Sequence, residues 1–359
     1  TNNGDDHTVT CSRCDYSVTE AHTFVDGTCV CGATEVTGPI PVDNLKFTNH
    51  ALTLADSIAV NFIIPTANLT YDSYRIVLSK DMYDANGALI APAVTELTSF
   101  VPYSASSNTY QMIVFTDVYA IDMASTIHAT IYGYKDGVEY VGAEDTYSVK
   151  TYALSQMNKT SASAALKTLC ADLLNYGAAA QNYKSYNTAN LANAEMTATM
   201  KGYASDRSAL SLSSIRSIVN ETNATVPFAG GALNFKSKVE LLFIFSLASV
   251  ADNTEGVSVV IEYTDIQKNE LVSKTYSASE IGVFDATAHR YMIALDTLNS
   301  YDVSTPITAT LYYNGVKQGT MVYNIESYCS SRYTNGTTLG ECCAMLMLYG
   351  NAAKAAFVK

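Results

Sequence analysis

Four cysteines near the start of the chain have the spacing of a metal-binding knuckle. Cys11 and Cys14 are separated by two residues, and Cys29 and Cys31 by one. Four thiolates on two tight turns can form the closed tetrahedral site that zinc accepts. A segment of this length buries too little apolar surface to hold its shape without such a staple. The spacing predicts a structural zinc site with these four cysteines as ligands.

Two disulfides are the alternative use of these thiols, and an oxidising extracellular compartment favours them. A bond between cysteines separated by a single residue would be strained, which favours zinc. His7 and His22 lie in the same segment and are reserve ligands. In either case all four sulfurs are used, so we expect a structural and not a catalytic site.

The rest of the chain contains one pattern twice. Residues 51–64 align with residues 232–245, and the apolar matches fall at alternate positions, which is the spacing of a strand. Residues 110–134 align in the same way with residues 290–313. The repeat therefore predicts two domains of the same fold.

Each copy continues with a hairpin and ends in a helix. The hairpin turns are Asp136-Gly137 and Asn314-Gly315, dipeptides that readily adopt the positive φ values of a tight turn. The helices carry apolar residues at helical spacing, and Gly177 and Gly350 fall on the apolar stripe. Because glycine costs a helix about 1 kcal/mol relative to alanine, we expect each one to be a packing notch facing the sheet.

The repeat also divides the four remaining cysteines into a matched pair and an unmatched pair. Cys170 and Cys343 occupy matching positions on the helix stripe and are predicted to be core thiols. Cys329 and Cys342 have no matching cysteine in the first copy and flank the turn of a helical hairpin. We therefore consider a disulfide between Cys329 and Cys342.

These patterns predict a mainly β fold with some helix. Alternating strands with frequent turn signals indicate two tandem β-sandwiches, each closed by a C-terminal helix and preceded by the small knuckle. The expected division is a cysteine-rich, zinc-ribbon-like module at 1–37, a first sandwich at 44–187, a polar connector at 188–205 and a second sandwich at 206–359.

Two stretches resemble a known group of proteins. "HTFVDGTCVCGATE" resembles small cysteine-rich modules of secreted and surface proteins of anaerobic Gram-positive bacteria, and "LKTLCADLLNYGAAAQNYKSYNTANLANAEMT" is similar to repeats in their large, mostly uncharacterised surface proteins. The resemblance implies an extracellular, cell-associated location. It transfers no catalytic residue.

Charge and hydropathy narrow the choice of partners. The net charge of −13 repels phosphate backbones and anionic headgroups, so we expect no nucleic-acid partner. The longest apolar run is shorter than the roughly 18 residues that span a bilayer, which argues against membrane insertion. The expected partners are copies of the chain itself or other surface proteins.

The chain has no recognisable enzyme motif. We expect a non-catalytic structural or adhesive protein of the cell surface, with self-assembly into filaments as one form of that function. The alternative is a carbohydrate-binding module. Its binding face would use Tyr132, Tyr134 and Tyr312, which are predicted to point outward from strands, although the absence of tryptophan counts against it.

Overall fold

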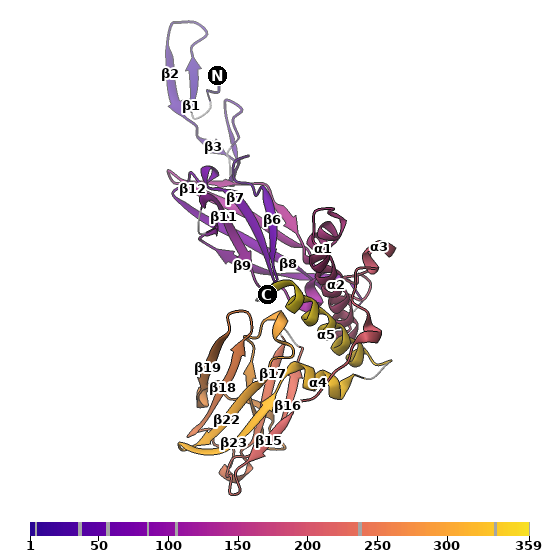
Figure 1. Ribbon diagram of the computed structural model, residues 1–359. Coiled ribbons are helices and arrows are strands. Elements are labelled where there is room, and N and C mark those ends of the chain that lie inside the picture. The colour runs from indigo at the N-terminus through magenta and orange to yellow at the C-terminus, as the bar shows by residue number, and fades with distance from the viewer. Residues whose placement is uncertain are drawn as a thin grey trace.

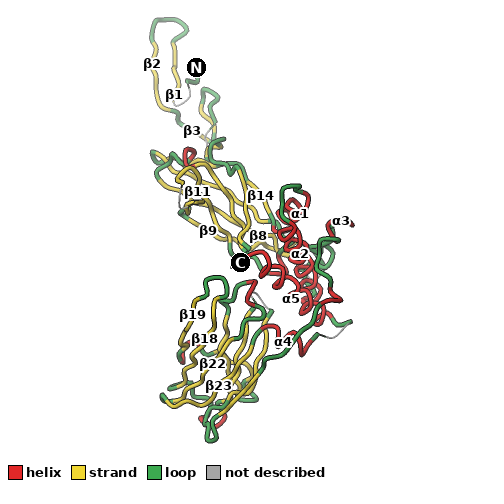
Figure 2. The backbone as a smooth tube through the Cα atoms, in the orientation of Figure 1, coloured by secondary structure: helices red, strands yellow, loops and turns green. Residues whose placement is uncertain are grey.

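The computed structural model divides into three parts arranged along an elongated body (Figure 1). A small N-terminal module lies at one end, a second β-sandwich lies at the other, and helices lie beside the first sandwich and at the junction (Figure 2). The description covers residues 1–3, 6–34, 38–54, 58–84, 86–104, 107–235, 239–333 and 336–358. The fold is mainly β with helices, as predicted.

The N-terminal module consists of two short hairpins. Strands β1 (Asp6–Thr10) and β2 (Ser17–Ala21) pair antiparallel, and β3 (Phe24–Val25) pairs with β4 (Thr28–Cys29). In the second hairpin the turn residues Asp26 and Gly27 both have positive φ, as a tight two-residue turn requires.

The first sandwich packs a sheet in the order β10-β11-β7-β6 against a larger sheet in the order β5-β13-β12-β8-β9, with β14 also paired to β12. Its strands are β5 (Ile40–Pro41), β6 (Asn49–Thr53), β7 (Ala59–Pro65), β8 (Ser73–Tyr83), β9 (Leu89–Leu97), β10 (Val101–Ser104), β11 (Ser107–Phe115), β12 (Ile127–Lys135), β13 (Val138–Val141) and β14 (Asp145–Tyr147).

The second sandwich repeats this arrangement. Its two sheets have the orders β16-β17-β21-β20 and β15-β23-β22-β18-β19. Its strands are β15 (Ser217–Asn220), β16 (Phe228–Asn234), β17 (Glu240–Ser246), β18 (Val257–Asp265), β19 (Glu270–Tyr276), β20 (Gly282–Asp285), β21 (Arg290–Leu295), β22 (Ile307–Tyr313) and β23 (Val316–Tyr323).

Alternation along equivalent strands explains why both copies form sandwiches. Every second residue of β12 is buried, and β22 buries Ile307, Ala309 and Leu311 in the same way. The turns after these two strands, Asp136-Gly137 and Asn314-Gly315, have the positive φ values that the sequence predicted.

A helical hairpin follows each sandwich. The first comprises α1 (Val149–Asn158) and α2 (Ala164–Lys184), and the second comprises α4 (Ile325–Arg332) and α5 (Thr338–Phe357). The side chains of Ser163 and Thr337 cap the two long helices by accepting hydrogen bonds from Leu166 and Gly340 amides. No helix in the described part of the chain is long and apolar enough to cross a membrane.

The long helices join the two copies. α2 packs against α5, with the rings of Tyr176 and Tyr349 stacked at 5.8 Å between centroids. Both rings are buried, and the apolar residues of the two sandwiches and all four helices form one continuous core. The two copies therefore form a single packed unit.

The glycines of these helices do not face the sheet, which corrects the expectation from the sequence. Each faces the short 3₁₀ turn of its own copy, η2 (Ala120–Asp122) or η6 (Ser300–Asp302), and the residue that follows it. A Cβ at Gly177 would lie 2.7 Å from the Met123 sulfur, and one at Gly350 would lie 2.5 Å from both methyl groups of Val303. Each glycine does form a packing notch, as predicted, but the notch accommodates the turn that crosses between the two sheets.

The connector is held against α2 by buried polar side chains. Asp172 of α2 accepts hydrogen bonds from the amide and the hydroxyl of Ser205. Gln181, which is fully buried, donates from its amide nitrogen to the carbonyls of Asn187 and Asn190 and accepts from the Ala192 amide. The connector also contains the short helix α3 (Ala198–Lys201). Its path is therefore fixed by hydrogen bonds as well as by apolar contact.

The first sandwich contains a buried ion pair that has no counterpart among the described residues of the second. Lys80 Nζ lies 2.8 Å from the carboxylate of Asp122, and both side chains are 2% exposed. Asp122 and the equivalent Asp302 both accept from a backbone amide, that of Tyr119 or Asn299, and Asp302 accepts from the Thr305 hydroxyl in place of the lysine. Burial raises the pKa of both Asp122 and Asp302, and in Asp122 the lysine partly offsets that effect.

Candidate metal centre

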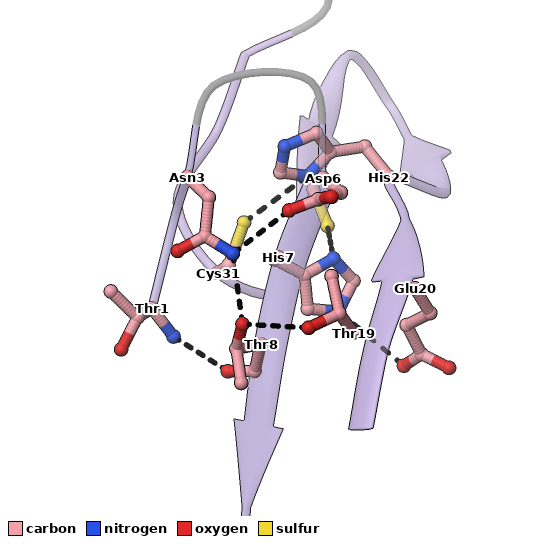
Figure 3. Close-up of polar contacts among 10 residues, drawn as sticks. Thr1, Asn3, Asp6, His7, Thr8, Thr19, Glu20, His22 and Cys31 are labelled. Carbon is pink, nitrogen blue, oxygen red and sulfur yellow. Dashed lines mark hydrogen bonds and ion pairs between the residues drawn. The ribbon is translucent and has the colours of Figure 1, made fainter. Parts of the chain in front are cut away.

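Four side chains of the N-terminal module converge into a possible metal site (Figure 3). Ligand atoms of His7, His22, Cys29 and Cys31 all lie within 4.8 Å of one another. The Cys31 sulfur is 3.4 Å from His22 Nδ1, and the Cys29 sulfur is 3.7 Å from His7 Nδ1. Two imidazoles and two thiols form a ligand set that tetrahedral zinc accepts.

Each ligand is positioned by a different local element. His7 lies in β1, His22 directly follows β2, and Cys29 ends β4. Cys31 follows in a turn in which Gly32 has a φ of +87°, a conformation that glycine adopts without strain. The two hairpins therefore contribute one histidine pair and one cysteine pair to the same point.

The surroundings favour a charged thiolate. A hydrogen bond from the Cys31 backbone amide, followed by one from His22, lowers the pKa of Cys29 to about 6. The other ring nitrogen of His7, Nε2, lies 3.4 Å from the Glu20 carboxylate but makes no hydrogen bond to any described residue, and His7 is 4% exposed. Glu20 thus lies where the second layer of a metal site places a carboxylate.

Cys11 and Cys14 lie elsewhere, which corrects the predicted ligand set. They occupy the exposed tip of the β1–β2 hairpin, and we call them the hairpin-tip thiols. Cys11 is four residues beyond His7 on an extended strand, a separation of about 13 Å. Here the Arg13 amide donates to the Cys11 sulfur, and a hydrogen bond with Cys14 lowers the pKa of Cys11.

The spacing of the cysteines could not reveal this division. The separation of Cys11 and Cys14 by two residues is compatible with a metal-binding knuckle. Here, however, these two residues lie at the tip of the β1–β2 hairpin, while the ligand His7 lies near its base. The signal that was available is the pair His7 and His22, the reserve ligands, which flank the hairpin on neighbouring strand ends.

The four remaining cysteines are buried. Cys170 and Cys343 are core thiols on equivalent helices, as predicted. Cys329 on α4 faces Cys343 rather than Cys342, so the predicted Cys329–Cys342 pairing is not the contact that forms. Consecutive helical residues point about 100° apart, so only one of the two can face α4. The hydrogen bond with Cys343, together with burial, raises the pKa of Cys329.

The tyrosines of the predicted sugar-binding face are half-buried. The Arg75 guanidinium lies 3.9 Å from the centroid of the Tyr132 ring and donates to the Tyr134 hydroxyl, which in turn donates to Glu139. Tyr312 lies on the equivalent strand of the second copy. One ring face of Tyr132 is thus occupied by an internal cation, which does not favour stacking on a sugar.

The histidines outside the module bond to carboxylates. The described contacts are those of His50 with Asp145, His128 with Asp81 and Glu144, and His289 with Asp252. These contacts account for the positions of the three histidines as local side-chain pairs.

Comparisons with known proteins identify no family. No family model matches the chain, and no curated protein matches it. Among solved structures, the chain is similar over 76% of its length to the crystal structure of the outer membrane decaheme cytochrome OmcA, of which 67% is covered, with 9% identity and a TM-score of 0.17. It is also similar over 83% of its length to Astrotactin-2, a vertebrate-specific, perforin-like membrane protein, of which 51% is covered, with 7% identity and a TM-score of 0.18. Scores this low carry no argument about fold or function.

Proposed function

We propose that this chain is a non-catalytic structural or adhesive protein of the bacterial cell surface. In this role two fused sandwiches form a stiff body, and a zinc-stapled N-terminal module is presented at one end. The partners are other surface proteins or further copies of the chain.

One observation carries the proposal. The two sandwiches share a continuous core through α2 and α5, while the N-terminal module lies at the far end of the body (Figure 1). A joint with a large apolar contact resists bending, whereas domains linked only by a flexible tether move independently. A stiff body with a small terminal module suits a spacer or an assembling subunit.

The metal centre supports the same reading. With four protein ligands, the site has no open position for a substrate, which is the arrangement of structural zinc sites. In a module made of two short hairpins, metal binding would supply most of the folding free energy. The centre would therefore stabilise the terminal module and take no part in a reaction.

The metal assignment is tested by titrating the reduced full chain with zinc and with cobalt. We expect one ion per chain and a cobalt spectrum with thiolate charge-transfer bands. Replacement of Cys29 and Cys31 by serine should abolish binding. The matched control replaces the hairpin-tip thiols by serine and should keep the ion.

Two results would contradict this assignment. Loss of the ion in the hairpin-tip control, with retention after His7→Ala, would restore the four-cysteine site predicted from the spacing. Quantitative disulfides within the module in protein purified without reductant would replace the zinc site altogether.

The structural role is tested by electron microscopy of native material and by light scattering of the purified chain from micromolar to millimolar concentration. Ordered filaments or arrays, or a mass that rises with concentration, are expected. A chain that stays monomeric throughout and binds a defined glycan on an array would overturn the proposal in favour of a carbohydrate-binding module.

A further inference from the structure

A groove on the second sandwich collects half of the chain's arginines. The sequence contains six arginines among 21 basic residues and has a net charge of −13. Arg216, Arg290 and Arg332 line one groove of about 580 Å³ over the sheet of β16, β17, β21 and β20.

Separate elements bring these three side chains together. Arg216 directly precedes β15, Arg290 begins β21, and Arg332 ends α4, which packs against β16 (Figure 1). A Cβ at Gly230 would lie 3.6 Å from the guanidinium of Arg216, so that side chain lies over β16. The groove is therefore a product of the tertiary fold.

The three guanidinium groups have no internal carboxylate partner. Among the described residues, no carboxylate lies within ion-pair distance of any of them, and all three arginines are exposed. By contrast, Arg75 pairs with Glu139, and Arg207 pairs with Glu341. Charges that the fold does not neutralise are available to an external anion.

The carboxylate beside Arg290 in the sheet bonds to the backbone. Asp285 lies across from Arg290 in the β20–β21 pairing, but its carboxylate accepts from the Ala288 amide. On the other wall the guanidinium of Arg332 lies 5.8 Å from the Tyr328 ring centroid. Arg332 is thus placed by packing against an aromatic ring.

Part of the groove is apolar. Leu242 and Ile244 of β17 and Met292 of β21 lie among its lining residues, and Val283 and Phe284 of β20 are 57% and 42% exposed at its side. Exposed apolar side chains are uncommon on the outer face of a sandwich sheet, which is usually polar. A ligand that matches the groove combines negative charge with some apolar groups.

The first copy lacks this groove chemistry. Arg290 aligns with Tyr110, and Arg332 aligns with Gln156. The arginines are therefore not required by the shared fold, which both copies form. They distinguish the second sandwich from the first.

We infer that this groove binds an acidic peptide segment of a partner protein, one in which carboxylate and apolar side chains alternate. Guanidinium groups bind carboxylates in a bidentate manner, and the apolar part of the groove takes the intervening side chains. A polysaccharide acid would lack apolar side chains for that part, and Asn234 is the one uncharged amide among the lining residues. A long polyanion would also be repelled by the rest of the chain. The inference stands apart from the proposed structural role.

The test is fluorescence anisotropy of a labelled octapeptide of alternating glutamate and leucine, mixed with the full chain at low ionic strength. We expect saturable binding that weakens as salt is added. Replacing all three groove arginines by glutamine should weaken binding at least tenfold. The charge-matched control replaces the exposed Lys135, Lys159 and Lys201 by glutamine and should change the affinity less than twofold.

A second variant separates geometry from charge. Replacing the three arginines by lysine keeps the charge and removes the planar fork, so binding should fall to an intermediate level. Circular dichroism of each variant checks that it is folded. If the triple variant fails to fold, the single variant Arg216→Gln is tested in its place, and we expect it to weaken peptide binding about threefold.

Three outcomes would overturn the inference. One is the absence of saturable peptide binding. Another is equal weakening when Lys135, Lys159 and Lys201 are replaced by glutamine, which would mean nonspecific attraction. The third is arginine-dependent binding of polygalacturonate in place of the peptide, which would assign the groove to an acidic polysaccharide. None of these outcomes depends on whether the chain forms filaments.

Discussion

Gly350 offers a direct test of how α5 packs against the turn that crosses between the sheets of the second sandwich. Judged from the helix alone, Gly350→Ala should stabilise the protein by about 1 kcal/mol, because alanine is the better helix former. The tertiary contact predicts the opposite sign. A Cβ at this position would lie 2.5 Å from both methyl groups of Val303 and 3.0 Å from its Cβ.

Val303 has little freedom to move away. Its side chain is 2% exposed, and its carbonyl accepts a hydrogen bond from the Glu326 amide at the start of α4. Rotation cannot relieve the clash, because both methyl groups and the branch point are involved. Overpacking of this kind costs about 1–3 kcal/mol, and we place it at the upper end. After the gain in helix propensity, the net loss should be about 2 kcal/mol.

The assay is urea denaturation followed by circular dichroism, on the single variants and on the double variant Gly350→Ala with Val303→Ala. The single change Val303→Ala should itself cost about 2 kcal/mol through the cavity that it leaves. In the double variant the new methyl group fills that space, so the two losses should combine to at least 1 kcal/mol less than their sum. A rise in stability for Gly350→Ala alone, with additive effects in the double variant, would refute the packing notch.

Three further predictions concern the interior. Lys80→Met should lower the free energy of unfolding by about 3–5 kcal/mol, because the carboxylate of Asp122 would stay buried without a cation. Burial already raises the pKa of Asp122, so the folded state holds the proton to higher pH than the unfolded chain does. The loss of unfolding free energy in Lys80→Met should therefore grow as pH rises through the folded-state pKa of Asp122 and shrink in acid. Urea titrations at pH 4 and pH 7 measure it, and equal losses at the two pH values would count against this reasoning. Gln181→Leu leaves buried backbone groups unpaired and should speed tryptic cleavage within the connector at 188–205 at least tenfold. An unchanged cleavage rate would mean that the other contacts of the connector, such as those of Ser205 with Asp172, are enough to hold it. The fully buried thiol of Cys329 should resist iodoacetamide in the metal-free folded chain while the hairpin-tip thiols are alkylated, which peptide mass spectrometry can verify; equal labelling of all of them would contradict its burial.

Local patterns made much of the architecture predictable. The alternation in 51–64 and 232–245 identified equivalent strands, and the dipeptides Asp136-Gly137 and Asn314-Gly315 identified the hairpin turns, since both signals depend on residues adjacent in the chain. The duplication identified the helices that end each copy for the same reason. Such features follow from period and backbone preference, which a sequence carries explicitly.

The ligands of the metal centre show where this reasoning stops. Spacing identified Cys29 and Cys31, but Cys11 and Cys14 also form a closely spaced pair and lie at the other end of a hairpin. Which side chains meet depends on the register and direction of paired strands. That information is absent from the separation of two cysteines along the chain.

By itself, the sequence determined the duplication, the β-rich class, the turns and the buried faces of strands and helices. The tertiary structure alone decided what those faces meet: α2 against α5, Gly350 against Val303, Cys329 against Cys343, and three distant arginines around one groove. The physical reason is that the periodicity of apolar residues shows that a face is covered but does not identify the element that covers it. The partner is selected by shape and chain path, which arise only when all the elements pack together.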